Sequence, residues 1–224
     1  IKAIKQINSS LKIYIGEGEG GYNSFSMTEA FKKMGYVELE KRYDNVTTIN
    51  LSEQPTKIVE LKTKSLSYQL ELPQLLLDEI DFSISCPLPK VHCMTHVTLA
   101  LKNQWGCIPD TMRLKNHYVF GDIIGQICEK LKFKYAFLDG KYGLDTNGPM
   151  NGDPVDLDWF AASNSLGAFD LVISDLMGFD WKKIGYLKKA SQNGFIPNRE
   201  EIDVIGDCQA IKRKFNLKRE LWNY

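Results

Sequence analysis

The second half of the chain alternates short apolar segments with amphipathic helical segments, and this rhythm constrains the fold most. Apolar residues at helical spacing predict a helix over residues 121–132, and the following run YAFLD, residues 135–139, predicts a strand. A further strand is predicted over residues 159–163 and a further helix over residues 166–178. Alternating strands and helices predict an α/β fold with a mixed, largely parallel sheet and helices on both faces, in three layers.

The first half shows a weaker pattern of the same kind. Ser26 and Glu29 form a capping-box pattern that opens a helix, although Gly35 weakens the helical prediction in its middle. Two alternating runs, residues 57–63 and 65–72, are close enough in the chain to add a β-hairpin. The other predicted strands cover residues 11–18, 45–51, 82–87 and 202–206, and the other predicted helices cover residues 26–42, 74–80 and 180–194.

Composition places the chain among ordinary globular proteins. The chain has 224 residues, of which 43% are hydrophobic and 25% charged, and this composition excludes a disordered chain. The length predicts one α/β domain over residues 1–224. Because the chain opens on Ile1 rather than Met, we expect an amino-terminal portion to be missing. Its 28 basic and 28 acidic residues cancel, so we expect neither nucleic acid nor a membrane as partner. The oligomeric state stays open.

The cysteines are five in number and widely spread. They are Cys86, Cys93, Cys107, Cys128 and Cys208, and no CxxC pair occurs among them. This spacing gives no support to structural zinc or to the usual iron–sulfur motifs. We interpret them as reduced thiols in a reducing compartment, and we expect a cytoplasmic location.

The segment at residues 86–110, CPLPKVHCMTHVTLALKNQWGCIPD, is the first candidate for a functional site. It follows a predicted strand directly, and in open α/β sheets ligands gather beyond the carboxyl ends of strands. We expect Lys90 to bind and Lys102 to neutralise a carboxylate or phosphate, while Asn103 orients it by hydrogen bonding. The alternative is that these polar groups only cap turns and hydrate a surface loop.

All three histidines fall between residues 92 and 117. We predict that His92 moves a proton near neutral pH and that His117 contacts the ligand. A metal is the alternative, since His92 and His96 are four residues apart, would share one side of a helix, and could ligate zinc together with Cys93 or His117. The sequence has no HExxH motif, and we assign neither a metal nor a cofactor.

The segment at residues 139–159 is the second candidate. It is rich in aspartate and glycine, and Asp139 is predicted to end a strand, the usual place of a functional carboxylate. We predict a catalytic role for Asp139, a ligand contact at Gly148, where the backbone approaches closely, and a further contact at Asp170 in the following helix. A calcium site is one alternative, although the spacing of the acidic residues does not fit an EF-hand. A turn-rich loop with solvated aspartates is another.

Two weaker patterns lie towards the ends of the chain. The glycine-rich run GEGEGG, residues 16–21, follows a strand and could cradle a phosphate, but it lacks the GxGxxG and P-loop patterns. Glu17 and Glu19 would repel a phosphate unless a metal lay between them. The basic tail at residues 211–222 is interpreted as a solvated helix face.

The order of these motifs resembles the family known as domain of unknown function 362. The run VTLALKN with the preceding lysine and histidines resembles the central motif of that family, and a later DG, GP, G, S, D, G series resembles its second half. The resemblance covers roughly residues 80–206 well and residues 11–42 loosely. The matching residues are Pro87, Lys90, His92, Thr95, Thr98, Lys102, Asn103, Trp105, Gly106, His117, Asp139, Gly140, Asn147, Gly148, Pro149, Gly152, Ser163, Asp170 and Gly178.

The sequence departs from the family at two motif positions. Leu88 stands where a lysine is common, and His96 stands where a glycine is usual. Some relatives carry ferredoxin-like cysteine clusters, which this chain lacks. The resemblance implies that the two candidate segments form one site. We therefore expect an uncharacterised α/β protein that binds a small anionic molecule, and whether it is an enzyme stays open. The alternatives are a redox or iron–sulfur accessory domain whose cluster lies outside this chain, and a non-catalytic binding module.

Overall fold

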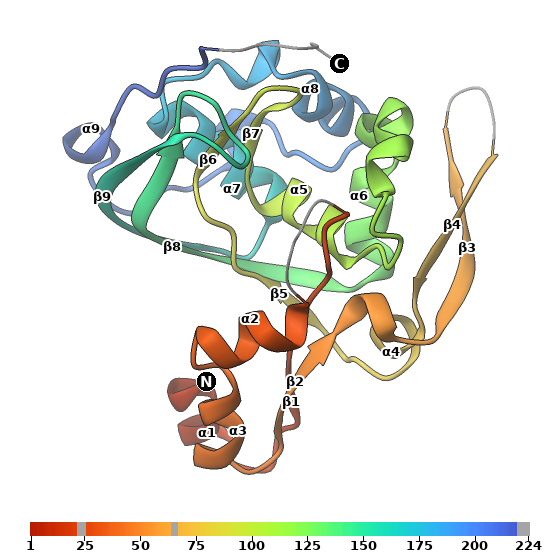
Figure 1. The fold of residues 1–224 in the computed structure, drawn as a ribbon. Coiled ribbons are helices and arrows are strands. Elements are labelled where there is room, and N and C mark those ends of the chain that lie inside the picture. Colours follow the sequence, from red (N-terminus) through yellow and green to blue (C-terminus); the bar gives the residue numbers. More distant parts are fainter. Residues whose placement is uncertain (22–25, 64–66, 219–224) are drawn as a thin grey trace.

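The protein has a small amino-terminal lobe, a projecting hairpin and a larger body (Figure 1). The structure is a computed structural model that describes residues 1–21, 26–63 and 67–218. The connection of the predicted hairpin at residues 64–66 and the end of the basic tail, from residue 219 on, therefore lie outside the described residues.

The amino-terminal lobe combines a parallel strand pair with three short helices. Ser26 and Glu29 form the predicted capping box, in which the Glu29 N–H donates to the Ser26 hydroxyl at 3.2 Å. The helix predicted over residues 26–42 is wrong in one respect, since it is two helices with a break at Gly35, where φ is +78°. The elements are α1 (Lys2–Ile7), β1 (Ile13–Glu17), α2 (Met27–Lys33), α3 (Val37–Arg42) and β2 (Val46–Asn50), with β1 parallel to β2.

The projecting hairpin confirms the alternating pattern read from the sequence. β3 (Thr56–Lys62) and β4 (Ser67–Pro73) pair in antiparallel register. The hairpin is preceded by the short helix η1 (Leu51–Glu53) and followed by α4 (Gln74–Asp78), as the apolar run after Pro73 predicts.

The sheet of the larger body is mixed, and the α/β fold class is confirmed. Its longest strand, β8 (Phe133–Asp145), pairs in parallel with β5 (Ser83–Ser85) and β6 (Lys90–His92). It also forms a long antiparallel hairpin with β9 (Asp153–Ser163), while β6 forms a short one with β7 (His96–Thr98). The parallel pairs join segments far apart in sequence, and the antiparallel pairs are local hairpins.

The segment at residues 139–159 is mainly a hairpin, which corrects two predictions. Asp139 does not end a strand but lies within β8, opposite Phe160 of β9. The pairing continues past a register irregularity between Gly140 and Tyr142, because a glycine tolerates the local distortion of a bulge. The connection between β8 and β9 is therefore only residues 146–152, and other turn-forming residues of the segment, such as Gly143 and Pro154, lie within the two strands.

The strand predicted over residues 202–206 is wrong. In the structure this segment follows the short helix η5 (Arg199–Glu201) without regular secondary structure, and Ile205 is 96% exposed. Its β-branched residues favour extended backbone, but a strand needs a neighbouring strand with which to pair, and none of the described strands lies beside it.

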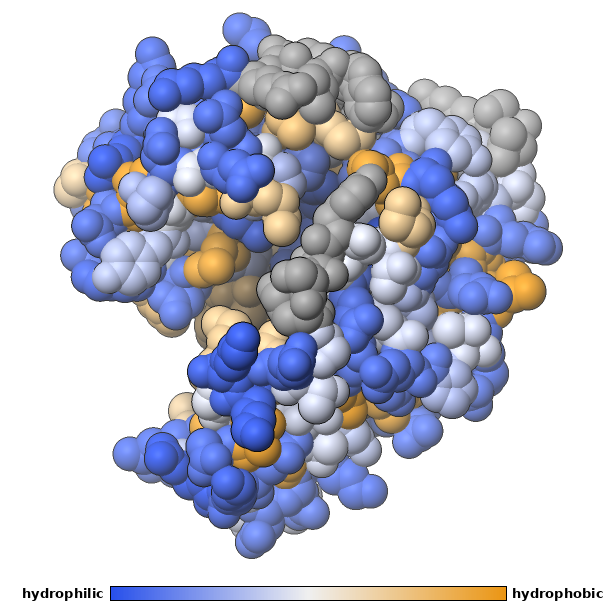
Figure 2. All heavy atoms as spheres, viewed as in Figure 1, coloured by the Kyte–Doolittle hydropathy of each residue, from blue (hydrophilic) through white to orange (hydrophobic). Residues whose placement is uncertain are grey.

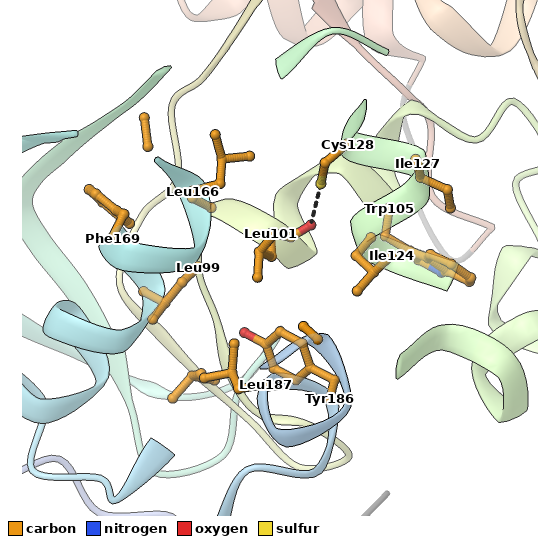
Figure 3. Packing of buried hydrophobic residues seen from close by; sticks show 14 of the residues in the cluster. Leu99, Leu101, Trp105, Ile124, Ile127, Cys128, Leu166, Phe169, Tyr186 and Leu187 are labelled. Atoms are coloured by element: carbon orange, nitrogen blue, oxygen red, sulfur yellow. Dashed lines mark hydrogen bonds between the residues drawn. The ribbon is translucent and has the colours of Figure 1, made fainter. Parts of the chain in front are cut away.

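Four helices of the larger body pack together and supply a large part of the core. Leu99, Leu101, Trp105 and Tyr186 point into this shared interior together with side chains of the neighbouring helices (Figure 3). The helix predicted over residues 166–178 is confirmed as α7. The Ser165 side chain caps it by accepting a hydrogen bond from the N–H of Ala168. The helices are α5 (Ala100–Asn103), α6 (Phe120–Lys130), α7 (Leu166–Leu176) and α8 (Gly185–Gln192). The other helices described in the larger body include η2 (Gln104–Cys107), η3 (Arg113–Val119), η4 (Trp181–Lys183) and α9 (Cys208–Ile211).

The face of the molecule shown in Figure 2 is largely hydrophilic. Figure 2 shows apolar side chains at a notch between the amino-terminal lobe and the larger body. Across the described residues, each helix is too short or too polar to cross a lipid bilayer. All five cysteines are free thiols.

Candidate functional site

The β6–β7 hairpin presents several of the predicted site residues. Lys90 lies opposite Thr98, and His92 lies opposite His96. Because alternate residues of a strand point to the same face, Lys90 and His92 share one face of the hairpin, while Val91 between them is fully buried on the other.

The helical arrangement on which a metal site at His92 and His96 depended is wrong. These residues belong to two strands joined by a tight turn, and His96 has a positive φ of 62° at the start of β7. Among the described residues, no group of three or more His, Cys, Asp or Glu side chains is placed to hold a metal ion.

Asp170 fixes the helix that carries Lys102 and Asn103. The carboxyl group of Asp170, fully buried on α7, accepts hydrogen bonds from the N–H groups of Ala100 at 2.7 Å and Leu101 at 3.1 Å, and burial raises its pKa to about 8. These amides belong to the first turn of α5, which has no intrahelical acceptor for them. The sequence places Asp170 in the site as a ligand contact, and the structure gives it the position of a helix cap.

Five cationic or imidazole side chains gather beside α5, and we call them the basic cluster: Lys90, His92, Lys102, Arg113 and His117. Burial lowers the pKa of Lys102, and the neighbouring Lys90 and Arg113 lower it further. Burial and then Lys102 lower the pKa values of both His92 and His117. Members from β6, α5 and η3 thus act on one another electrostatically, although up to 27 residues separate them in the sequence.

Lys102 is the central member of the basic cluster. Its side chain is buried, with Nζ 5.1 Å from the centre of the Phe120 ring. In the part of the chain that the structure describes, Lys102 has no hydrogen bond or ion pair with a side chain or carbonyl group. Burial lowers the pKa of Lys102 to about 7, since a charged amine without a counter-ion is unfavourable in the interior.

The two imidazoles of the cluster are held neutral. Burial lowers the pKa of His92 to about 2 and that of His117 to about 4. The Nδ1 atom of His92 accepts a hydrogen bond from the Met94 N–H at 3.1 Å, so the neutral ring carries its proton on Nε2. His92 therefore offers an N–H donor near neutral pH, and its predicted role in proton transfer stays a prediction.

The glycine-rich run brings a carboxyl group to the basic cluster. The Gly21 N–H donates to the Thr111 carbonyl at 2.9 Å, and Arg113 donates to the Glu19 carbonyl at 2.6 Å, which ties this run to the larger body. Glu17, at the end of β1, acts electrostatically on Lys90 and Arg113. Glu17 is exposed in part to solvent, yet burial by the surrounding protein raises its pKa.

Three buried polar atoms of the described residues have no hydrogen-bond partner, and all lie at or beside the basic cluster. They are the Thr98 hydroxyl, the Trp105 indole N–H and Nδ1 of His117. Thr98 faces Lys90 across the hairpin, and the rings of Trp105 and His117 are 5.4 Å apart. Since an unpaired buried polar group costs about 1–3 kcal/mol, their concentration here is typical of a site built to receive a polar ligand.

The remaining predicted site residues differ in their placement. Asn103 is half-buried and donates weakly to the Ser85 hydroxyl at 3.4 Å. Gly148 lies against β6, where its carbonyl accepts from the Cys93 N–H at 3.1 Å and a Cβ would collide with the Val91 carbonyl oxygen. Asp139 is exposed on β8 and, among the described residues, forms no hydrogen bond or ion pair with the basic cluster. The structure therefore brings Gly148 and Asp170 close to the first segment but not Asp139.

Sequence reasoning gave no role to Arg113 and interpreted Glu17 as an obstacle to anion binding. The signal that points to Glu17 is the glycine-rich run directly after a strand, which permits close approach to another segment. Arg113 has no such signal, because its place in the site depends on contacts between the lobe and the body.

Comparison with known proteins identifies one family. Residues 1–175 match the family described as Domain of unknown function (DUF362). A similar curated protein is the thylakoid-associated protein sll1697 of Synechocystis sp., with 29% identity over 131 residues. This match covers 55% of the chain and 41% of the relative, so the chain spans less than half the length of that protein.

Proposed function

The chain belongs to the DUF362 family, whose function is unknown, and from the geometry of its site we propose that it binds a small anionic molecule at the basic cluster. In this proposal Lys102 and Lys90 neutralise the anion, and Asn103 and His117 contact it. His92 contributes its Nε2 hydrogen as a donor. Arg113 adds positive charge beside them.

The observation that carries this proposal is the buried side chain of Lys102, which lies among other cations and has no acidic partner among the described residues. A buried charge without a partner costs several kcal/mol, and two further cations nearby raise that cost. A bound carboxylate or phosphate removes the cost by supplying the missing negative charge and hydrogen-bond acceptors. The unpaired Thr98 hydroxyl and Trp105 N–H offer two additional donors.

Thermal unfolding with added anions tests the proposal. Phosphate, oxalate and citrate are each added at constant ionic strength to wild type, Lys102→Met and the control Lys188→Met, in which the lysine is exposed. A ligand that binds only the folded state at 100 times its Kd stabilises it by about 2.7 kcal/mol. We expect at least one anion to raise the Tm of wild type and of the control but not that of Lys102→Met. Equal shifts in all three proteins, or none in any, would contradict the proposal.

We also propose a cytoplasmic location, supported by the five free thiols, which fit a reducing compartment. The relative's name gives a thylakoid association for that protein. Fractionation of the producing cells, followed by detection of this chain, tests the location. Recovery with the membrane fraction after a high-salt wash would contradict it.

A further inference from the structure

We propose that Lys102 is a nucleophilic amine that forms an imine with a small aldehyde or ketone bearing a carboxylate or phosphate group. This inference rests on the proposed anion site and adds a substrate class and a chemical step to it. An amine becomes a nucleophile when desolvation or a neighbouring cation favours its neutral form, and both conditions meet at Lys102.

The surroundings of Lys102 separate it from the other lysines of the chain. Among the lysines in the described ranges, Lys102 alone has a buried side chain. Its Nζ atom lies 5.1 Å from the centre of the Phe120 ring, and among the described residues no carboxylate pairs with it. By contrast, Lys189 pairs with Asp122 at 2.8 Å and Lys212 pairs with Asp175 at 2.9 Å.

The other members of the cluster define what the carbonyl compound carries. Lys90 is half-buried and acts on Lys102, so an anionic group of the substrate can be neutralised by Lys90 while the carbonyl carbon meets Lys102. Thr98, which faces Lys90 across the hairpin, and Trp105 hold two unpaired buried hydrogens for oxygen atoms of the substrate. A compound with neighbouring anionic and carbonyl groups, such as a small oxo acid, satisfies both requirements.

The step balances without an added oxidant or reductant. The lone pair of the neutral Lys102 amine forms a C–N bond as the carbonyl π electrons move to oxygen, and one amine proton passes to that oxygen. The resulting carbinolamine loses its hydroxyl group together with the second amine proton, so water leaves and a C=N bond remains.

Reductive trapping tests the proposal. The folded chain is incubated with glyoxylate and sodium cyanoborohydride at pH 7, and labelled lysines are mapped by peptide mass spectrometry over time. We expect Lys102 to be labelled at least ten times faster than Lys188, and this preference to disappear in denaturant. The preference for Lys102 should be smaller when wild type reacts with acetaldehyde, which lacks the anionic group. It should also be smaller when the variant Lys90→Gln reacts with glyoxylate.

The outcomes separate this inference from the proposed function. If the anions still raise the Tm while Lys102 is labelled no faster than Lys188, the imine is overturned and the anion site stands. If neither the Tm shift nor selective labelling occurs, both fail. Equal labelling of Lys102 by glyoxylate and acetaldehyde would support a reactive amine but overturn the anionic substrate class.

Discussion

The carboxylate of Asp170 on α7 accepts a hydrogen bond from the N–H of Ala100 on α5, 70 residues earlier in the chain, at 2.7 Å. This contact fixes the first turn of the short helix that carries Lys102. A buried acid is thereby used to position the basic cluster, while the amine of Lys102 has no acidic partner among the described residues. The arrangement stabilises the geometry of the site and leaves its charge unbalanced.

Replacing Asp170 by alanine should destabilise the protein more than replacing Asp175 on the same helix. Two buried N–H groups lose their acceptor in Asp170→Ala, which we expect to lower the free energy of unfolding by about 2–4 kcal/mol. Asp175 is exposed, and among the described residues its carboxylate pairs with Lys212 alone, so Asp175→Ala should change stability by less than about 0.5 kcal/mol. Urea unfolding followed by circular dichroism measures both. Similar losses would show that the cap does not hold α5.

Replacing Lys102 by methionine should stabilise the unliganded protein. Methionine keeps most of the volume of the lysine and removes a buried amine without a counter-ion, so we expect a gain of about 1–4 kcal/mol in urea unfolding. The same variant should lose stabilisation by anions. A stability gain with loss of ligand response distinguishes a binding residue from a structural one, and a large loss of stability would contradict the account given of Lys102.

Stability should depend on pH through Lys102 in a window above neutrality. The folded-state pKa of about 7 lies below the unfolded value of 10.5, so the unfolded state binds more protons between these values. The free energy of unfolding contributed by Lys102 therefore rises with pH from about 7 to about 10.5, by at most about 1.4 kcal/mol per pH unit. The difference between wild type and Lys102→Met isolates this contribution. A difference that is constant from pH 6.5 to 10 would mean that the amine is not desolvated.

Two threonines on the same hairpin provide a matched test of the unpaired donors. The Thr98 hydroxyl is buried without a partner, whereas the Thr95 hydroxyl donates to the Val97 carbonyl at 3.1 Å. Valine has a similar shape but no hydroxyl, so Thr98→Val should raise the free energy of unfolding by about 1 kcal/mol and Thr95→Val should lower it by a similar amount. Thr98→Val should also weaken anion binding, as the Tm shift measures. Equal losses of stability in both variants would show that the Thr98 hydroxyl is satisfied.

Much of the secondary structure could be predicted from local pattern alone. The capping box at Ser26, the β3–β4 hairpin and the helix over residues 166–176 follow from periodicity and end signals that a short stretch of chain contains. The local sequence pattern did not predict the secondary structure of residues 139–159 and 202–206, because a strand forms only where another strand pairs with it. Glycines and aspartates suggested a loop in the first case, and β-branched residues suggested a strand in the second.

The sequence by itself determined the α/β fold class and the residue types from which a basic site can be built. It supplied Lys90, His92 and Lys102 within one short segment, because these residues lie close along the chain. Only the tertiary structure decided that Lys102 is buried and has no acidic partner among the described residues. It also decided that Arg113 joins the basic cluster, that Glu17 acts on Lys90 and Arg113, and that Asp139 forms no described contact with the cluster. Burial and charge coupling depend on which elements pack together, and that packing brings residues from the lobe and the body to one place.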